Sequence, residues 1–93
     1  MALATTEVGI STYIKIGDDT TTITFQCQSN NPIVINFTAA DSAPAGTEPG
    51  LIYKFFQGEV KKTVTDLTHV SSAAYVWARA LTGDKATVLY EDA

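Results

Sequence analysis

The residues of this chain that could do chemistry are few, and none lies in a spacing that a catalytic or metal site requires. The sequence contains one histidine, His69, and one cysteine, Cys27. A transition-metal site needs several histidine, cysteine or carboxylate ligands, and neither an HxH nor an HExxH spacing occurs. His69 stands in a Thr/Ser-rich stretch, where a lone histidine is typically a surface or capping residue. These patterns predict a chain with no metal site and no cofactor.

Other catalytic patterns are missing as well. No Gly-x-Ser-x-Gly motif is present, and the chain is short for a typical hydrolase. Asp18-Asp19 resembles a fragment of a calcium loop, but the further oxygen ligands and the closing Glu do not follow. Gly46, Gly50 and Gly58 lack the spacing of a phosphate-binding loop. We therefore predict that the protein is not an enzyme.

Three aromatic residues near the C-terminal end, Tyr75, Trp77 and Tyr90, could form a flat platform for a sugar ring. In a small all-β domain such residues are more often part of the core or of an interface, which is the interpretation we favour. Cys27 has no second cysteine to pair with, so an intrachain disulfide is excluded. Because Cys27 lies in an alternating stretch, we expect it to be a small buried apolar residue.

Length, charge and hydropathy restrict the protein class. A chain of 93 residues is expected to form one domain, spanning residues 1–93. The net charge of −4 disfavours binding to the phosphate backbone of a nucleic acid. No apolar run approaches the roughly 20 residues that span a bilayer, and the N-terminal residues lack the pattern of a signal peptide. We expect a soluble protein, made in a cytoplasm, that binds neither nucleic acid nor membrane.

Alternating apolar and polar residues predict six or seven short strands and no helix of normal length. The expected strands span residues 7–16 (with a break near Ser11 as an alternative), 20–28, 33–38, 51–56, 60–67, 75–80 and 86–91. Residues 60–67 also fit one face of a helix, and we favour a strand because of their Thr and Val content. Such strands with frequent turns predict an all-β fold, a small antiparallel β-sandwich or barrel, with meander and Greek-key connections both open.

The turns and faces of these strands give more specific expectations. Residues 29–32 (Ser-Asn-Asn-Pro) and 82–85 (Thr-Gly-Asp-Lys) have turn chemistry, and each predicts a hairpin between the strands that flank it. In residues 20–28, Ile23, Phe25 and Cys27 are expected to point inward. The outward residues Thr24, Gln26 and Gln28 form an uncharged polar stripe. Such a stripe suits water, and it also suits a subunit contact made by hydrogen bonds.

Two segments lie outside the expected strands. Residues 1–6 are small and unpatterned, and we expect a flexible N-terminal arm or a segment that pairs with a neighbour. Residues 39–50 form a long Ala/Pro/Gly-rich loop. Loops of this length are uncommon in small domains and are often functional. This loop is either a crossover between sheets or a contact arm to another subunit.

Short motifs along most of the chain, from about residue 10 to residue 91, follow a recognisable order. They are Asn31-Pro32-Ile33-Val34, Ala43-Pro44-Ala45, Pro49-Gly50-Leu51-Ile52, Val76-Trp77-Ala78-Arg79, Thr82-Gly83, Val88 and Glu91. In this order and spacing the chain resembles small virion proteins of tailed bacteriophages, a group that includes capsid decoration (cement) proteins and other head or tail accessory proteins. Each motif is degenerate, and the order carries the resemblance.

The resemblance implies a non-catalytic protein of the virion that stabilises the head through contacts with other copies of itself and with the major capsid protein. It favours a homotrimer made in the host cytoplasm. The alternative is a tail-fibre or baseplate accessory protein that binds carbohydrate. Residues expected at a subunit or capsid interface are Ala43, Pro44, Pro49, Tyr53, Phe56, Tyr75, Trp77 and Arg79. For Arg79 we hold open that it only covers Trp77 and faces water.

Overall fold

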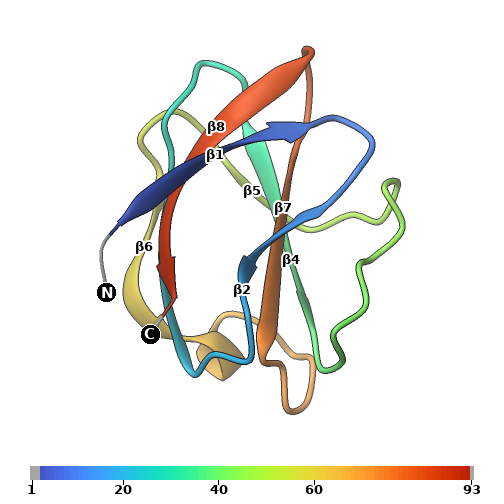
Figure 1. Cartoon of the computed structure of the whole chain (residues 1–93), viewed down its shortest axis with the longest axis vertical. Coiled ribbons are helices and arrows are strands. Elements are labelled where there is room, and N and C mark those ends of the chain that lie inside the picture. Colours follow the sequence, from blue (N-terminus) through green and yellow to red (C-terminus); the bar gives the residue numbers. More distant parts are fainter. Residues whose placement is uncertain (1–2, 93) are drawn as a thin grey trace.

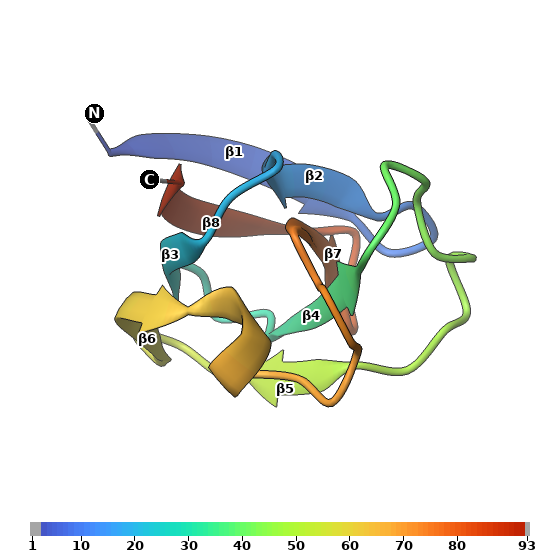
Figure 2. The ribbon, with the colours of Figure 1, turned by 90° about the horizontal axis from the view of Figure 1, so that it is seen from below.

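The computed structural model describes residues 3–92, with side chains for residues 3–91. Its elements are β1 (Ala4–Gly9), β2 (Ile14–Gly17), β3 (Thr22–Cys27), β4 (Ile33–Thr38), β5 (Leu51–Tyr53), β6 (Gly58–Thr63), the 3₁₀ turn η1 (Val64–Asp66), β7 (Tyr75–Ala80) and β8 (Lys85–Asp92). The strands form two antiparallel sheets (Figures 1 and 2). Sheet A has the order β1-β8-β3-β6, and sheet B has the order β2-β7-β4-β5.

A simple pairing rule organises both sheets. β1 pairs with β8, β2 with β7, β3 with β6 and β4 with β5, so the two strand numbers of each of these pairs add up to nine. The chain is therefore one long antiparallel ribbon whose tip is the connection between β4 and β5. The ribbon is folded over, so that β8 also pairs with β3 and β7 with β4. Each strand thereby hydrogen-bonds mostly to residues far away in the sequence.

The core lies between the two sheets because a strand points alternate side chains to opposite faces. Sheet A contributes Val8, Ile23, Phe25, Cys27, Ala86 and Val88, and sheet B contributes Ile16, Ile33, Ile35, Phe37, Val76, Ala78 and Ala80. The inward set predicted for residues 20–28 is confirmed, since all three of its members are buried. The all-β class is confirmed as well.

The strand count was too low. Residues 7–16 form two strands, β1 and β2, and the residues between them carry the chain from sheet A to sheet B. Ile10 and Ile14 are exposed while Tyr13 is buried, so the predicted alternation ends after β1. Residues 51–56 contain only the three-residue β5, and residues 60–67 divide into β6 and η1.

Both predicted hairpins are wrong. The turn at residues 29–32 joins β3 of sheet A to β4 of sheet B, and the turn at residues 82–85 joins β7 of sheet B to β8 of sheet A. Turn residues specify that the chain reverses direction. They do not specify whether the next strand pairs in the same sheet or lies on the opposite one, and here more distant strands supply the hydrogen-bond partners.

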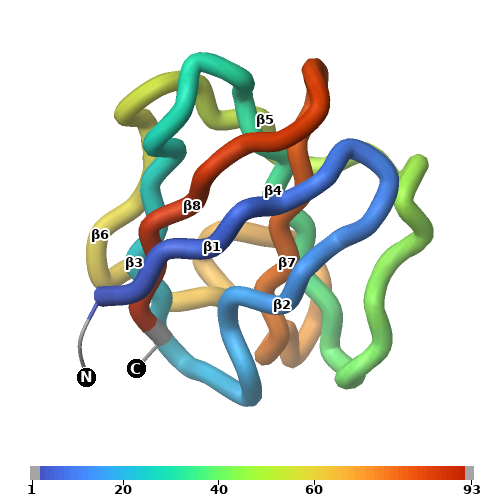
Figure 3. The backbone as a smooth tube through the Cα atoms, turned by 45° about the horizontal axis from the view of Figure 1, so that its top comes forward, coloured from blue at the N-terminus to red at the C-terminus, as the bar shows by residue number. Residues whose placement is uncertain are grey.

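The two segments predicted to lie outside the strands pack on the chain itself. Ala4, Thr5 and Thr6, part of the predicted flexible arm, belong to β1 and pair with β8. Residues 1 and 2 lie outside the described residues. The long loop, residues 39–50, comes close to the segment between β1 and β2 (Figure 3). A Cβ atom added to Gly46 would lie only 1.9 Å from the backbone oxygen of Ser11.

Candidate functional site

The residues predicted to form an interface do not form one patch. Ala43 and Pro49 are exposed and Pro44 is half-buried, all in the long loop. Tyr75, Trp77 and Arg79 lie on the outer side of sheet B, where Tyr75 is half-buried and the other two are buried. Tyr53 is half-buried against the core, and Phe56 is exposed in the turn after β5.

Trp77 belongs to a second, smaller apolar cluster outside sheet B. It packs with Tyr13 and Val34 and is only 6% exposed. Its indole Nε1 donates a hydrogen bond of 2.8 Å to Oγ1 of Thr38. Tyr13 covers this cluster because the segment between β1 and β2 folds over sheet B. Trp77 therefore has little surface left for a partner.

Lys15 lies over the rings of Tyr75 and Trp77. Its ammonium group lies 5.6 Å from the ring centre of Tyr75 and 5.9 Å from that of Trp77. The same group pairs with Asp41 at 2.9 Å and with Asp18 at 3.3 Å. The hydrogen bond to Asp41 is the main reason that the pKa of Lys15 is raised.

Arg79 is buried beneath two loops. Its guanidinium donates hydrogen bonds to the backbone oxygens of Ala80, Glu48 and Ile10, at 3.2, 3.2 and 3.5 Å. It also lies 5.2 Å from the ring centre of Tyr13. Arg79 therefore holds the long loop and the segment between β1 and β2 against sheet B. The interpretation that it faces water is wrong.

Tyr53 joins the end of sheet B to the core. Its ring meets Phe25 edge to face, with ring centres 4.9 Å apart. Its hydroxyl donates a 3.1 Å hydrogen bond to Oε2 of Glu59. Burial raises the pKa of Tyr53, and the hydrogen bond and charge of Glu59 raise it further.

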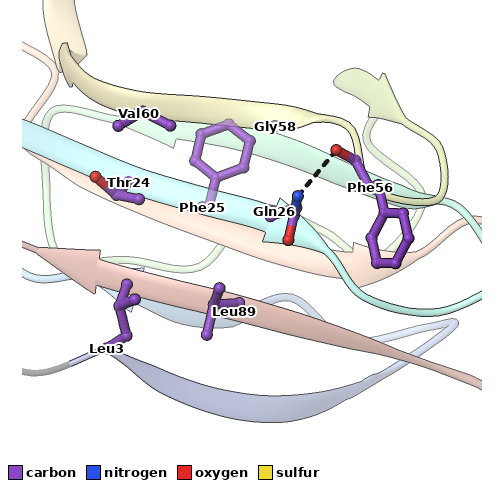
Figure 4. A pocket seen from close by; sticks show the side chains of 8 residues that line it. All are labelled: Leu3, Thr24, Phe25, Gln26, Phe56, Gly58, Val60 and Leu89. Atoms are coloured by element: carbon purple, nitrogen blue, oxygen red, sulfur yellow. Dashed lines mark hydrogen bonds between the residues drawn. The ribbon is translucent and has the colours of Figure 1, made fainter.

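The outer face of sheet A carries a hollow with a volume of about 350 Å³ (Figure 4). Every residue that lines it is uncharged: Leu3, Thr24, Phe25, Gln26, Phe56, Gly58, Val60 and Leu89. Leu3, Phe56 and Val60 are 54%, 62% and 72% exposed. Figure 4 shows Leu3 and Leu89 on one side of β3, Val60 on the other, and the ring of Phe56 at one end. Part of the predicted polar stripe, Thr24 and Gln26, lies along the floor.

Phe56 is held at this rim in a strained backbone conformation. Its φ is 64°, in the left-handed region that bulky residues rarely adopt. Its N–H donates to the backbone oxygen of Cys27 at 2.8 Å, and its own oxygen accepts from Nε2 of Gln26 at 3.0 Å. The ring stacks on Phe55 with centres 3.9 Å apart. Backbone strain at an exposed aromatic residue is typical of binding sites.

The residues considered for catalysis and sugar binding lie apart. His69 is exposed and has no hydrogen-bond partner among the described residues. Cys27 is fully buried, with its Sγ directed to the backbone oxygens of Ser29 and Asn31, as predicted for a small core residue. Tyr90 packs on the core between the sheets, whereas Trp77 lies outside sheet B, so the suggested sugar platform does not form.

Within residues 3–91, no group of three or more His, Cys, Asp or Glu side chains is gathered as metal ligands would be. The described part of the chain also contains no helix long and apolar enough to cross a membrane. Comparison of the chain with family models, curated proteins and solved structures finds no match in any of the three.

Proposed function

We propose that this chain is a non-enzymatic structural protein of a bacteriophage virion, a capsid decoration protein that contacts further copies of itself and the major capsid protein. The order of motifs from residue 10 to residue 91 supports this setting. The strand order supports it as well, because two four-stranded sheets built from a folded ribbon are the arrangement that a jelly-roll sandwich would have. Viral capsid proteins are among the proteins that use this architecture. Architecture alone does not imply function, whereas an exposed surface of suitable chemistry can support one.

The observation that carries the proposal is the uncharged hollow on sheet A with Phe56 at its rim. Interface centres are depleted of charge and enriched in aromatic residues. The hollow combines exposed apolar side chains with Thr24 and Gln26, which offer hydrogen bonds without a charge to desolvate. A small domain also gains stability by burying such a face against a second copy. We propose that the protein forms a homotrimer in which the hollow on sheet A lies at the contact between subunits.

The test compares two substitutions of an exposed β-branched residue by Asp. Val60→Asp places a charge in the hollow, and Ile10→Asp, at a residue outside it, serves as the matched control. We expect sedimentation equilibrium to give the mass of a trimer of 9.9 kDa subunits for the wild type and Ile10→Asp, and a monomer for Val60→Asp. Wild-type protein should co-sediment with heads of the phage that encodes it, and Val60→Asp should do so less.

Two results would overturn the proposal. A wild-type chain that stays monomeric and does not bind heads rejects the decoration role. Equal behaviour of Val60→Asp and the wild type, with loss of assembly in Ile10→Asp, rejects the hollow as the contact and moves the interface elsewhere.

One observation favours the alternative of a carbohydrate-binding accessory protein. The ring of Phe56 is exposed beside the amide of Gln26, which gives an apolar face for a sugar ring next to a hydrogen-bonding group. This reading predicts glycan-array binding by the wild type that Phe56→Ala abolishes. A glycan array without hits, together with trimer formation, decides for the structural role.

A further inference from the structure

Arg79 is the only charged side chain among the described residues that is about nine-tenths buried. None of the ion pairs found in the described part of the chain includes it. A buried cation is costly unless a counter-charge or a full set of hydrogen bonds compensates for its lost hydration. For Arg79 that compensation has to come from hydrogen bonds.

One edge of the guanidinium, the one between Nε and Nη2, is left open. A guanidinium has five N–H donors. Nη1 uses both of its N–H groups on the backbone oxygens of Ala80 and Ile10, and Nη2 uses one on Glu48. Nε has no hydrogen-bond partner. The two remaining N–H groups, on Nε and Nη2, belong to neighbouring nitrogens, and such a pair binds a carboxylate through two parallel hydrogen bonds.

A pocket of about 160 Å³ lies beside Arg79. Its other walls are apolar or neutral: Val34, Thr47, Pro49, Gly50, Ile52 and Leu81. Its size suits a carboxylate with a short apolar stem. No acidic residue lines it, so the counter-charge has to come from outside the pocket.

We propose that this pocket binds a carboxylate on a short apolar stem, held by the open edge of Arg79. Such a group occurs at the end of an Asp or Glu side chain of a second copy, and it occurs equally in a small free carboxylic acid. Nε is shielded from solvent, so binding requires a small movement of the residues that cover it. The proposal uses the outer side of sheet B and does not depend on the decoration role proposed for sheet A.

The test follows the Arg79 Nε–Hε resonance by NMR in ¹⁵N-labelled protein. Sodium propionate is titrated into dilute protein, with sodium chloride at equal ionic strength as the reference. We expect propionate to move the resonance to saturation and chloride to leave it nearly unchanged. R79K assigns the signal, because lysine retains the charge and lacks Nε–Hε. Equal, unsaturated drifts with both salts would overturn the proposal and leave Arg79 as a clasp between two loops.

A second variant keeps the test informative if R79K fails to fold. Ile52 is about half exposed on a short edge strand, so Ile52→Phe can narrow the pocket without entering the core. We expect the apparent dissociation constant for propionate to rise by about tenfold or more in Ile52→Phe, with the Nε–Hε signal retained. Unchanged propionate affinity in this variant would contradict binding in the pocket.

The source of the carboxylate is tested in the same samples. If a second copy supplies it, raising the protein concentration alone moves the Nε–Hε resonance, and propionate lowers the sedimenting mass. If the natural ligand is a free acid, the resonance is independent of protein concentration and responds only to propionate. Either result supports the carboxylate site, and a resonance that responds to neither rejects it.

Discussion

At the residue scale, Phe56 has a strained backbone conformation and an exposed ring. Its backbone is fixed in the left-handed region by hydrogen bonds to β3, and its ring gains little burial in return. A bulky residue in this conformation costs on the order of 1–3 kcal/mol. The hydrogen bonds to β3 hold this backbone in place, whereas the exposed ring recovers little of the cost by burial.

Replacing Phe56 by Asn should separate its effect on the stability of the fold from its effect on self-association. Asn tolerates the left-handed region, so we expect Phe56→Asn to keep or raise the free energy of unfolding, by up to about 1 kcal/mol, while self-association weakens. Urea unfolding followed by Trp77 fluorescence measures the free energy of unfolding, and sedimentation measures self-association. Phe55→Asn is the matched control, because Phe55 is exposed and its φ is not positive. A clear loss of stability in Phe56→Asn but not in Phe55→Asn would contradict the inference that the backbone of Phe56 is strained.

Tyr53 predicts how stability depends on pH. Its pKa in the folded chain lies above the ordinary value of 10.0, so above pH 10 the unfolded chain loses the phenol proton while the folded chain retains it. The unfolded state then binds fewer protons, and the free energy of unfolding falls as the pH rises. The raised pKa of Lys15 acts in the same direction.

The variant Tyr53→Phe keeps the ring contact with Phe25 and removes the ionisable group. We expect it to be less stable at neutral pH by about 0.5–1.5 kcal/mol, because Glu59 loses a hydrogen bond. We also expect its stability to fall less steeply above pH 10. Urea unfolding at a series of pH values checks both statements, and equal steepness in the two proteins would count against the role of Tyr53.

At the element scale, the long loop acts as a cover for sheet B. The backbone oxygen of Glu48 accepts hydrogen bonds from the hydroxyl of Tyr13, at 2.6 Å, and from the guanidinium of Arg79. Nδ2 of Asn36 donates to the oxygen of Pro49 at 3.0 Å. These contacts tie the loop to the segment between β1 and β2, to β4 and to β7, so it is held by its own chain. Only its exposed residues, such as Ala43 and Pro49, are left for a partner.

Gly46→Ala should loosen this cover. The added Cβ would lie 1.9 Å from the oxygen of Ser11, a backbone atom that cannot turn away. We expect a loss of about 1–3 kcal/mol in the free energy of unfolding and a more solvated Trp77, seen as red-shifted emission of the single tryptophan. Gly9→Ala is the matched control, since nothing lies within 4 Å of its added Cβ. Equal stability of both variants would mean that the loop tolerates displacement.

The sequence predicted local features well and distant partners poorly. Ile23, Phe25 and Cys27 were placed correctly because alternation along one strand depends only on neighbouring residues. The burial of Trp77 depends on Tyr13, and that of Arg79 depends on Glu48 in the long loop, so neither could be read from β7 alone. The exposed hollow was partly predicted through Thr24 and Gln26, but Leu3 and Val60 reach it only through strand pairing. Phe56 appeared as an interface residue, and its strained backbone had no sequence signal, since glycine is the usual residue there.

At the scale of the whole molecule, a chain of 93 residues with an uncovered apolar face is expected to have modest stability on its own. The self-association proposed above would then add to its stability by mass action. The melting temperature of the wild type should therefore rise with protein concentration. That of Val60→Asp should be independent of concentration, and Ile10→Asp should follow the wild type. Scanning calorimetry over a range of concentrations checks this, and a wild-type melting temperature that never changes would contradict it.

The rule that paired strand numbers add up to nine has a consequence for synthesis on the ribosome. Ala4 in β1 pairs with Tyr90 in β8, so β1 leaves the ribosome long before its hydrogen-bond partner exists. At ordinary translation rates this delay is roughly ten seconds. The inner pair, β4 with β5, is complete much earlier, so the ribbon closes from its tip outward. While β1 waits, its backbone is open to the β8 of a neighbouring chain whose own β1 has not yet paired. A polysome that makes many copies at once is thus the setting in which an exchanged β1 strand would arise.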